Sequence, residues 1–123
     1  MYKDILVVDD QPGIRLLLQD VLANEGYKVA TRETGQEALE ALRKTSYALV
    51  ILDYKLPVMD GVEVLKQLEA EQNKTPAILI SGLAEEMSQS LKNISNLKEI
   101  IAKPFNVQHI CTVVNQIIQQ SYT

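Results

Sequence analysis

Short apolar runs alternate along the chain with segments whose apolar residues recur at helical spacing. The runs occupy residues 5–8, 48–52, 76–80 and 100–102, and a weaker one occupies residues 27–31. Strands that are apolar at every position, rather than at every second position, are buried on both faces of a sheet. This pattern is typical of a parallel sheet covered by helices.

Helices are predicted between these runs. The first covers residues 12–25, because Pro12 suits a first helical position and Gly26 a helix end. The apolar stripe that this helix turns toward the core consists of Ile14, Leu17, Leu18, Val21 and Leu22.

Three later helices have recognisable N-caps. Thr34 and Glu37 form a capping-box pattern, and Asp60 and Asn106 are N-cap candidates for two others. A further helix, between the fourth and fifth strands, is marked by Met87, Leu91 and Ile94. Five β-then-α units result. Right-handed crossovers close them into an α/β fold, a (βα)5 doubly wound five-stranded parallel sheet.

The composition narrows the class of protein. The 123 residues suit one domain, and 12 Lys and Arg against 16 Asp and Glu give a net charge of −4, which disfavours direct binding to nucleic acid. The sequence contains neither a bilayer-spanning apolar run nor a signal-peptide pattern. Cys111 is the only cysteine in the sequence and cannot form an internal disulfide. One cysteine and one histidine, His109, are too few ligands to build a zinc site. We therefore expect a cytoplasmic protein without membrane insertion.

Reactive side chains follow four of the five predicted strands. Asp9 and Asp10 follow the first strand, Asp53 the third, Ser81 the fourth and Lys103 the fifth. The carboxyl ends of parallel strands border the working crevice of such a sheet, so these groups are expected to converge. Oxygen ligands suit a hard divalent cation such as Mg²⁺. A carboxylate nucleophile with a divalent cation, an ammonium group and a hydroxyl is suited to phosphoryl transfer.

Simpler interpretations exist for single members of this set. Asp9 and Asp10 could only cap the first helix, and Ser81 with Gly82 could be an ordinary turn. The joint occurrence of three carboxylates, a hydroxyl and Lys103 at strand ends favours the phosphoryl-transfer interpretation.

The chain resembles response-regulator receiver domains, the flavodoxin-like module of bacterial two-component signalling, from about Asp4 to the end of the last helix. The matching motifs are Asp9-Asp10, Asp53, the Leu-Pro-Val-Met-Asp-Gly segment at 56–61, Ser81-Gly82 and Lys103-Pro104-Phe105. Residues 8–15, Val-Asp-Asp-Gln-Pro-Gly-Ile-Arg, are most similar to stand-alone receivers of sporulation-type phosphorelays. On this basis we expect residues 1–123 to form one receiver domain without an effector domain.

The resemblance implies a role for each matching residue. Asp53 would accept a phosphoryl group from the phosphohistidine of a sensor histidine kinase or a histidine phosphotransferase. Asp10 and Asp53 would hold Mg²⁺ with the backbone carbonyl of Lys55, while Asp9 would act mostly through water. Lys103 would pair with Asp53 at rest and with the phosphoryl group afterwards, and the bond between Lys103 and Pro104 would be cis. Ser81 would turn toward the phosphoryl oxygens.

The chain would then be a phosphoacceptor signalling domain that assists its own phosphorylation, rather than an enzyme. Its dephosphorylation would be slow, because Lys55 and Leu83, two residues after Asp53 and Ser81, do not position water as a general base would. Ile100 replaces the aromatic ring usual three residues before the lysine, which favours movement of the helix after Ser81 as the output. Asn96-Leu97 replaces a small-residue pair, so the connection before the fifth strand is expected to differ.

We expect the helices of a kinase or phosphotransferase to dock beside the acidic pocket. The predicted partner face consists of Gln11, Gly13, Ile14, Leu16, Pro104 and Phe105. Leu16 lies off the core stripe and offers an apolar contact for a helical partner. We further expect a downstream protein target, a monomer before phosphorylation, Tyr54 covering the site, His109 at the surface and Cys111 in the core.

Other functions stay open as alternatives. The chain could be the receiver portion of a longer, for example transcriptional, regulator, or a non-phosphorylated interaction domain. An enzyme acting on small molecules is disfavoured. A flavin carrier would need a phosphate loop where Asp-Asp-Gln-Pro stands, and an aspartate-dependent phosphatase would need a carboxylate in place of Lys55.

Overall fold

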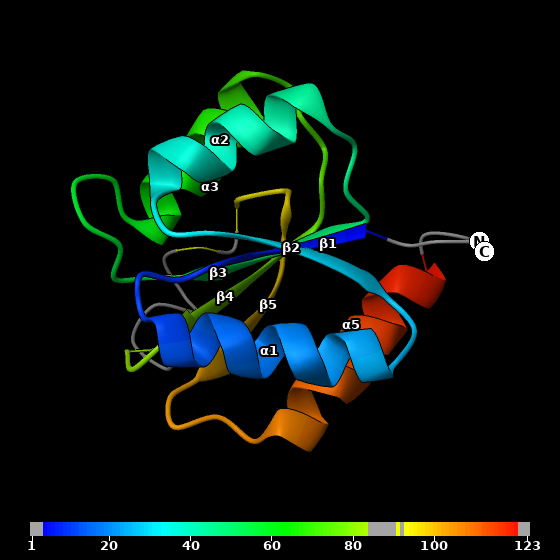
Figure 1. Ribbon diagram of the computed structural model, residues 1–123. Coiled ribbons are helices and arrows are strands. Elements are labelled where there is room, and N and C mark those ends of the chain that lie inside the picture. Colours follow the sequence, from blue (N-terminus) through cyan, green and yellow to red (C-terminus); the bar gives the residue numbers. More distant parts are fainter. Residues whose placement is uncertain (1–3, 84–90, 92, 121–123) are drawn as a thin grey trace.

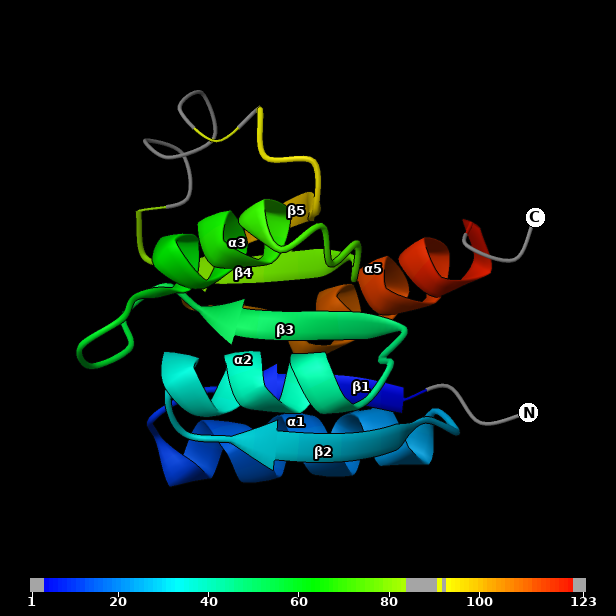
Figure 2. The same ribbon diagram turned by 90° about the horizontal axis from the view of Figure 1, so that it is seen from above.

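Five parallel strands form one sheet with helices on both faces, as predicted (Figures 1 and 2). The computed structural model describes residues 4–83, 91 and 93–120. The strand order β2-β1-β3-β4-β5 is that of the flavodoxin-like doubly wound fold. The strands are β1 (Asp4–Val8), β2 (Lys28–Arg32), β3 (Leu49–Asp53), β4 (Ala77–Ser81) and β5 (Leu97–Ala102). The helices are α1 (Pro12–Asn24), α2 (Gly35–Lys44), α3 (Gly61–Ala70) and α5 (Val107–Gln120).

The sheet separates two hydrophobic clusters. Helices α2 and α3 cover one face, and α1 and α5 cover the other (Figure 1). Along β1, Leu6 and Val8 belong to the cluster under α2 and α3, whereas Ile5 and Val7 belong to the cluster under α1 and α5. Successive side chains of a strand point to opposite faces, so a fully apolar strand contributes to both clusters. The prediction of a sheet buried on both faces is confirmed for β1, β3 and β4.

The predicted helix ends are found with small differences. Pro12 opens α1, and Gly26 follows its end at a φ of 97°. The N–H of Glu63 donates to Oδ1 of Asp60 at 2.9 Å, which completes the capping box of α3. The N–H of Glu37 donates to Oγ1 of Thr34 at 3.1 Å.

The capping pattern of α2 nevertheless departs from the predicted box. Oε1 of Glu37 accepts from the N–H of Glu33, one residue before the N-cap Thr34. The last helix is capped as predicted, since Oδ1 of Asn106 accepts from the N–H of His109 at 3.2 Å.

The predicted core stripe of α1 is wrong at Leu17, which is 42% exposed. Residues 17 and 18 lie about 100° apart around a helix. Because Leu18 and Leu22 point at the sheet and are buried, Leu17 is turned to the flank beside the exposed Leu16. The face that α1 buries is therefore narrower than its apolar stripe.

The fifth strand is longer and less buried than predicted. It begins at Leu97 rather than at residue 100, and Lys98 and Glu99 are exposed. β5 pairs only with β4 and forms an edge of the sheet, which leaves one side of the strand uncovered.

The connection before β5 is tied down by Asn96, whose buried side chain donates to the carbonyl oxygens of Asn73 and Thr75 at 2.6 and 2.9 Å. The predicted helix at Met87 lies mainly outside the described residues, although Leu91 and Ile94 are described and packed in the cluster under α2 and α3. In the part of the chain that the structure describes, no helix is long and apolar enough to cross a membrane.

Candidate functional site

The reactive side chains meet at one edge of the sheet, where the carboxyl ends of the strands lie. Asp9 follows β1, Asp53 ends β3, Ser81 ends β4, and Lys103 follows β5. The parallel register sets Asp53 against Ile80 and Ser81 against Ala102, so the strands end side by side. Because each of these residues ends a strand of the parallel sheet or directly follows one, sheet formation alone brings them together.

Three carboxylates form the acidic part of the site. One oxygen each of Asp9, Asp10 and Asp53 lies within 4.8 Å of the others, with Asp10 exposed and the other two buried. Burial raises the pKa of the Asp9 carboxyl, and the charges of Asp53 and Asp10 raise it further, against the lowering by the Gln11 N–H and Lys103. A cation bound between the carboxylates would relieve this repulsion. An all-oxygen donor set of this kind fits a hard divalent ion.

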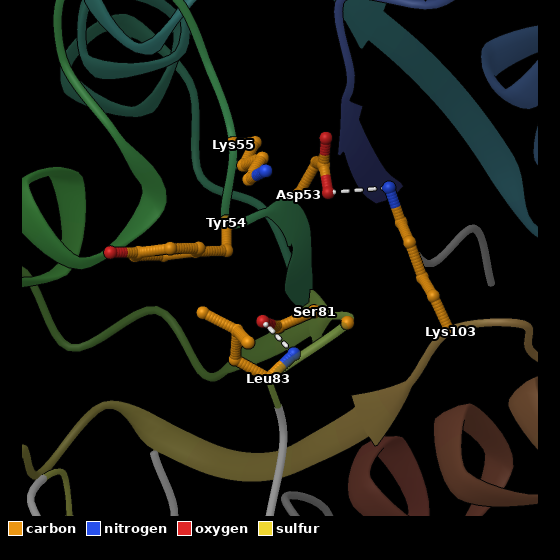
Figure 3. A pocket seen from close by; sticks show the side chains of 7 residues that line it. Asp53, Tyr54, Lys55, Ser81, Leu83 and Lys103 are labelled. Carbon is orange, nitrogen blue, oxygen red and sulfur yellow. Dashed lines mark hydrogen bonds and ion pairs between the residues drawn. The ribbon is translucent and has the colours of Figure 1, made fainter. Parts of the chain in front are cut away.

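Lys103 reaches across the end of the sheet to Asp53 (Figure 3). Its Nζ lies 2.8 Å from Oδ1 of Asp53, and the side chains are 29% and 5% exposed. The peptide bond between Lys103 and Pro104 is cis. The ammonium group thus neutralises part of the charge that Asp53 carries inside the protein while staying open to solvent on one side.

Ser81 lies beside this pair, and its Oγ accepts a hydrogen bond from the N–H of Leu83 at 2.9 Å (Figure 3). A pocket of about 270 Å³ opens above these groups. It is lined by Asp53, Tyr54, Lys55, Ser81, Gly82, Leu83 and Lys103. The pocket therefore exposes the Asp53 carboxylate, the Lys103 ammonium group and the Ser81 hydroxyl to one incoming group.

The loop from β3 to α3 contributes Tyr54 and Lys55 to the wall of the pocket. The carbonyl oxygen of Tyr54 accepts from the N–H groups of Leu56 and Gly61 at 3.1 and 2.9 Å, so the loop folds back over the end of β3. Gly61 is required there, because a Cβ would lie 2.7 Å from the carbonyl oxygen of Asp53. The resulting turn presents Lys55 next to Asp53 (Figure 3).

One residue without a predicted role also belongs to the site. Nη1 of Arg15 donates to the backbone carbonyl oxygen of Asp9 at 2.7 Å. Sequence spacing could not reveal this contact, because it depends on how α1 is placed against the end of β1.

The predicted partner face is exposed in part. Gln11, Gly13, Leu16 and Pro104 are exposed. Ile14 and Phe105 are half-buried, since they pack against the cluster under α1 and α5. His109 is exposed and Cys111 is buried, as predicted.

Residues 5–115 match the response regulator receiver domain family. The chain belongs to this family and is a receiver domain of response-regulator signalling, with the phosphoacceptor role of that class.

Two bacterial regulators are among the proteins to which the chain is similar. The chain is 38% identical over 117 residues to sporulation initiation phosphotransferase F of Bacillus subtilis, covering 94% of each sequence. It is 36% identical to the alkaline phosphatase synthesis transcriptional regulatory protein PhoP of the same organism, over 98% of this chain and only 50% of that protein. The chain thus spans about half the length of that transcriptional regulator.

A solved structure supports the same assignment. The response regulator TrrA from Thermotoga maritima, in complex with Mg²⁺ and BeF, is 35% identical and superposes with a TM-score of 0.83. The match covers 94% of this chain and 98% of that one.

Proposed function

We propose that Asp53 accepts a phosphoryl group from a phosphohistidine of a sensor histidine kinase or a histidine phosphotransferase. The observation that carries this proposal is the contact of the buried Asp53 with Lys103 at 2.8 Å inside a cluster of three carboxylates. A carboxylate oxygen of Asp53 forms a bond to phosphorus while the phosphorus–nitrogen bond breaks. The electron pair of that bond stays on the imidazole nitrogen.

Asp10, Asp53 and the backbone carbonyl of Lys55 would hold Mg²⁺, and Asp9 would act mostly through water. The mutual proximity of the three carboxylates and their all-oxygen chemistry support this assignment. Bound Mg²⁺ supplies positive charge to the oxygens of the transferred phosphoryl group.

The remaining groups of the pocket act on the phosphorylated state. Lys103 moves its ion pair from the Asp53 carboxylate to a phosphoryl oxygen, since its Nζ already lies beside the accepting atom. The Ser81 hydroxyl turns to donate a hydrogen bond to another phosphoryl oxygen. Because the Ser81 hydroxyl accepts a hydrogen bond from the N–H of Leu83, its reorientation would shift the chain directly after β4. We propose movement of the segment after Ser81, where the sequence predicts a helix mainly outside the described residues, as the output.

The phosphoryl group leaves slowly in this proposal. Lys55 and Leu83 stand two residues after Asp53 and Ser81 and line the pocket. In this proposal they take the positions from which water would be directed at phosphorus. An ammonium group and an isobutyl group have no acceptor atom that could hold a water molecule by a hydrogen bond or take its proton.

We further propose that the domain works alone, as a cytoplasmic phosphorelay receiver that is monomeric before phosphorylation and acts on a protein target. The support is the coverage of 94% of both sequences in the match to sporulation initiation phosphotransferase F. The histidine-bearing partner would dock over the face of Gln11, Gly13, Ile14, Leu16, Pro104 and Phe105, where Leu16 is 60% exposed.

A second candidate is the receiver portion of a longer transcriptional regulator. The match to half of the regulator PhoP favours it. Both candidates share the chemistry at Asp53. They differ in what responds to phosphorylation, which is a separate target protein in the first and another domain of the same chain in the second.

The chemistry is tested by intact-mass measurement after incubation with a small-molecule phosphoryl donor. The wild type is expected to gain one phosphoryl group only when Mg²⁺ is present, and Asp53→Ala to gain none. Asp20→Ala, which removes an exposed carboxylate on α1, is the matched control and should react like the wild type. A gain that survives in Asp53→Ala would refute the assignment of the acceptor.

A further inference from the structure

Arg15, in the first turn of α1, connects two loops. One carries the acidic pair Asp9 and Asp10, and the other precedes α2. Its Nη1 donates to the carbonyl oxygen of Asp9 at 2.7 Å, and its Nη2 lies 3.0 Å from Oε1 of Glu33. The Arg15 side chain is only 15% exposed, against 64% for Glu33. A largely buried guanidinium with a partner for each arm is held in one orientation by its planar geometry.

Asp9 is therefore held at three points. Its N–H donates to the carbonyl oxygen of Arg32 at the end of β2, at 3.2 Å. Its carbonyl oxygen accepts from Arg15, and its Oδ1 accepts from the N–H of Gln11 at 2.9 Å. The peptide unit between Asp9 and Asp10 sets the direction of both side chains. Arg15 thus orients the acidic pair through the backbone and occupies none of the carboxylate oxygens that a cation would use.

Glu33 supports Arg15 from the other side. Its N–H donates to Oε1 of Glu37 at 3.1 Å, which ties it to the first turn of α2. The carboxylate of Glu33 pairs with the second arm of the guanidinium and balances its charge. The first arm is consequently kept on the carbonyl oxygen of Asp9.

We propose that Arg15 and Glu33 are positioning residues that set the affinity of the Asp9–Asp10 pair for a divalent cation. This inference rests on the proposed Mg²⁺ site. Glu33 acts only through Arg15. Outer residues that hold metal ligands in place typically change metal affinity by about tenfold or more when they are removed.

The test follows Mg²⁺ binding through the backbone amide resonances of the wild type, Arg15→Gln, Glu33→Gln and the double variant. Arg15→Gln is expected to bind Mg²⁺ about tenfold more weakly, and Glu33→Gln to lose less. The double variant should bind no more weakly than Arg15→Gln alone. Without Mg²⁺, the Asp10 amide resonance should already move in Arg15→Gln, because its peptide carbonyl loses a hydrogen bond.

A comparable ion pair provides the matched control. Nη2 of Arg43, near the end of α2, lies 2.5 Å from Oε2 of Glu71, the residue that follows α3. Arg43→Gln should leave the Mg²⁺ affinity unchanged. Asp10→Asn tests the metal site itself and should abolish binding. Suppose that Asp10→Asn loses Mg²⁺ affinity while Arg15→Gln binds Mg²⁺ within about twofold of the wild type, well short of the loss of about tenfold expected for a residue that holds a metal ligand. This result would refute the positioning role and leave the metal site standing. A wild type that binds no Mg²⁺ would refute the metal site and this role together.

Discussion

Nζ of Lys103 lies 2.8 Å from Oδ1 of Asp53, and this ion pair connects the ends of β5 and β3, which are not neighbours in the sheet. The ammonium group faces a site that also holds Asp9 and Asp10. Lys103, from a distant part of the sequence, therefore pairs directly with the buried carboxylate of the resting site.

Removing that lysine should destabilise the domain when Mg²⁺ is absent. Lys103→Met leaves three neighbouring carboxylates without their facing cation, and we expect a loss of about 2 kcal/mol, below the full value for a buried pair because Lys103 is partly exposed. Added Mg²⁺ should restore part of the loss. Urea unfolding with and without Mg²⁺ measures both effects.

Asp53→Asn is the counterpart, because it removes one of the repelling carboxylates and leaves the lysine facing Asp9. We expect its unfolding midpoint without Mg²⁺ to equal or exceed that of the wild type. Equal losses of stability in Lys103→Met and Asp53→Asn would contradict the proposed charge balance.

The lifetime of the phosphoryl group should depend on Lys55. Lys55→Asn places an amide that can hold water next to the phosphoryl group, and we expect several-fold faster decay. Intact mass at intervals after removal of the donor gives the rate. Lys66→Asn, on the exposed face of α3, is the control and should decay like the wild type. Wild-type decay within seconds would contradict the proposed slow loss.

Two glycines should respond oppositely to alanine. A Cβ at Gly61 would lie 2.7 Å from both the Asp53 carbonyl oxygen and Cδ1 of Leu79, whereas Gly13 has no neighbouring atom within 4 Å. Gly61→Ala should cost about 2–3 kcal/mol through overpacking. Gly13→Ala should gain about 0.5 kcal/mol, because alanine favours the helix. Thermal unfolding separates the two, and a well-folded Gly61→Ala of unchanged stability would show that the loop wall can move.

The pair of Arg43 and Glu71 predicts an acid-sensitive contribution to stability. The hydrogen bond from Arg43, helped by one from Gln67, lowers the pKa of Glu71 from 4.5 to about 2. A carboxyl group whose pKa is lowered on folding stabilises the folded state at pH values above its ordinary pKa. This stabilisation is lost as the pH falls from about 4.5 toward 2. Carboxyl NMR titration should show the low midpoint in the wild type and a midpoint near the ordinary value in Arg43→Gln. A normal midpoint in the wild type would mean that the pair does not persist in solution.

The strand runs, the N-caps and the order of reactive residues follow from the sequence by itself. Each depends on local rules. An apolar run marks a buried strand, Asp60 and Asn106 sit where helices begin, and Asp53 directly follows apolar residues. Because a parallel sheet aligns the carboxyl ends of its strands, these local features already imply a site that contains Asp9, Asp53 and Lys103.

Only the tertiary structure decided which apolar residues stay exposed and which side chains touch. Leu17 belongs to an apolar stripe, yet it is exposed because α1 meets the sheet along Leu18 and Leu22. Lys98 and Glu99 extend β5, because an edge strand tolerates charge on its open side. The contacts of Arg15 with Asp9 and Glu33 depend on the placement of α1 and the β2–α2 loop around the end of β1. Such distances arise from the way separate helices, strands and loops pack against one another, which residue spacing does not encode.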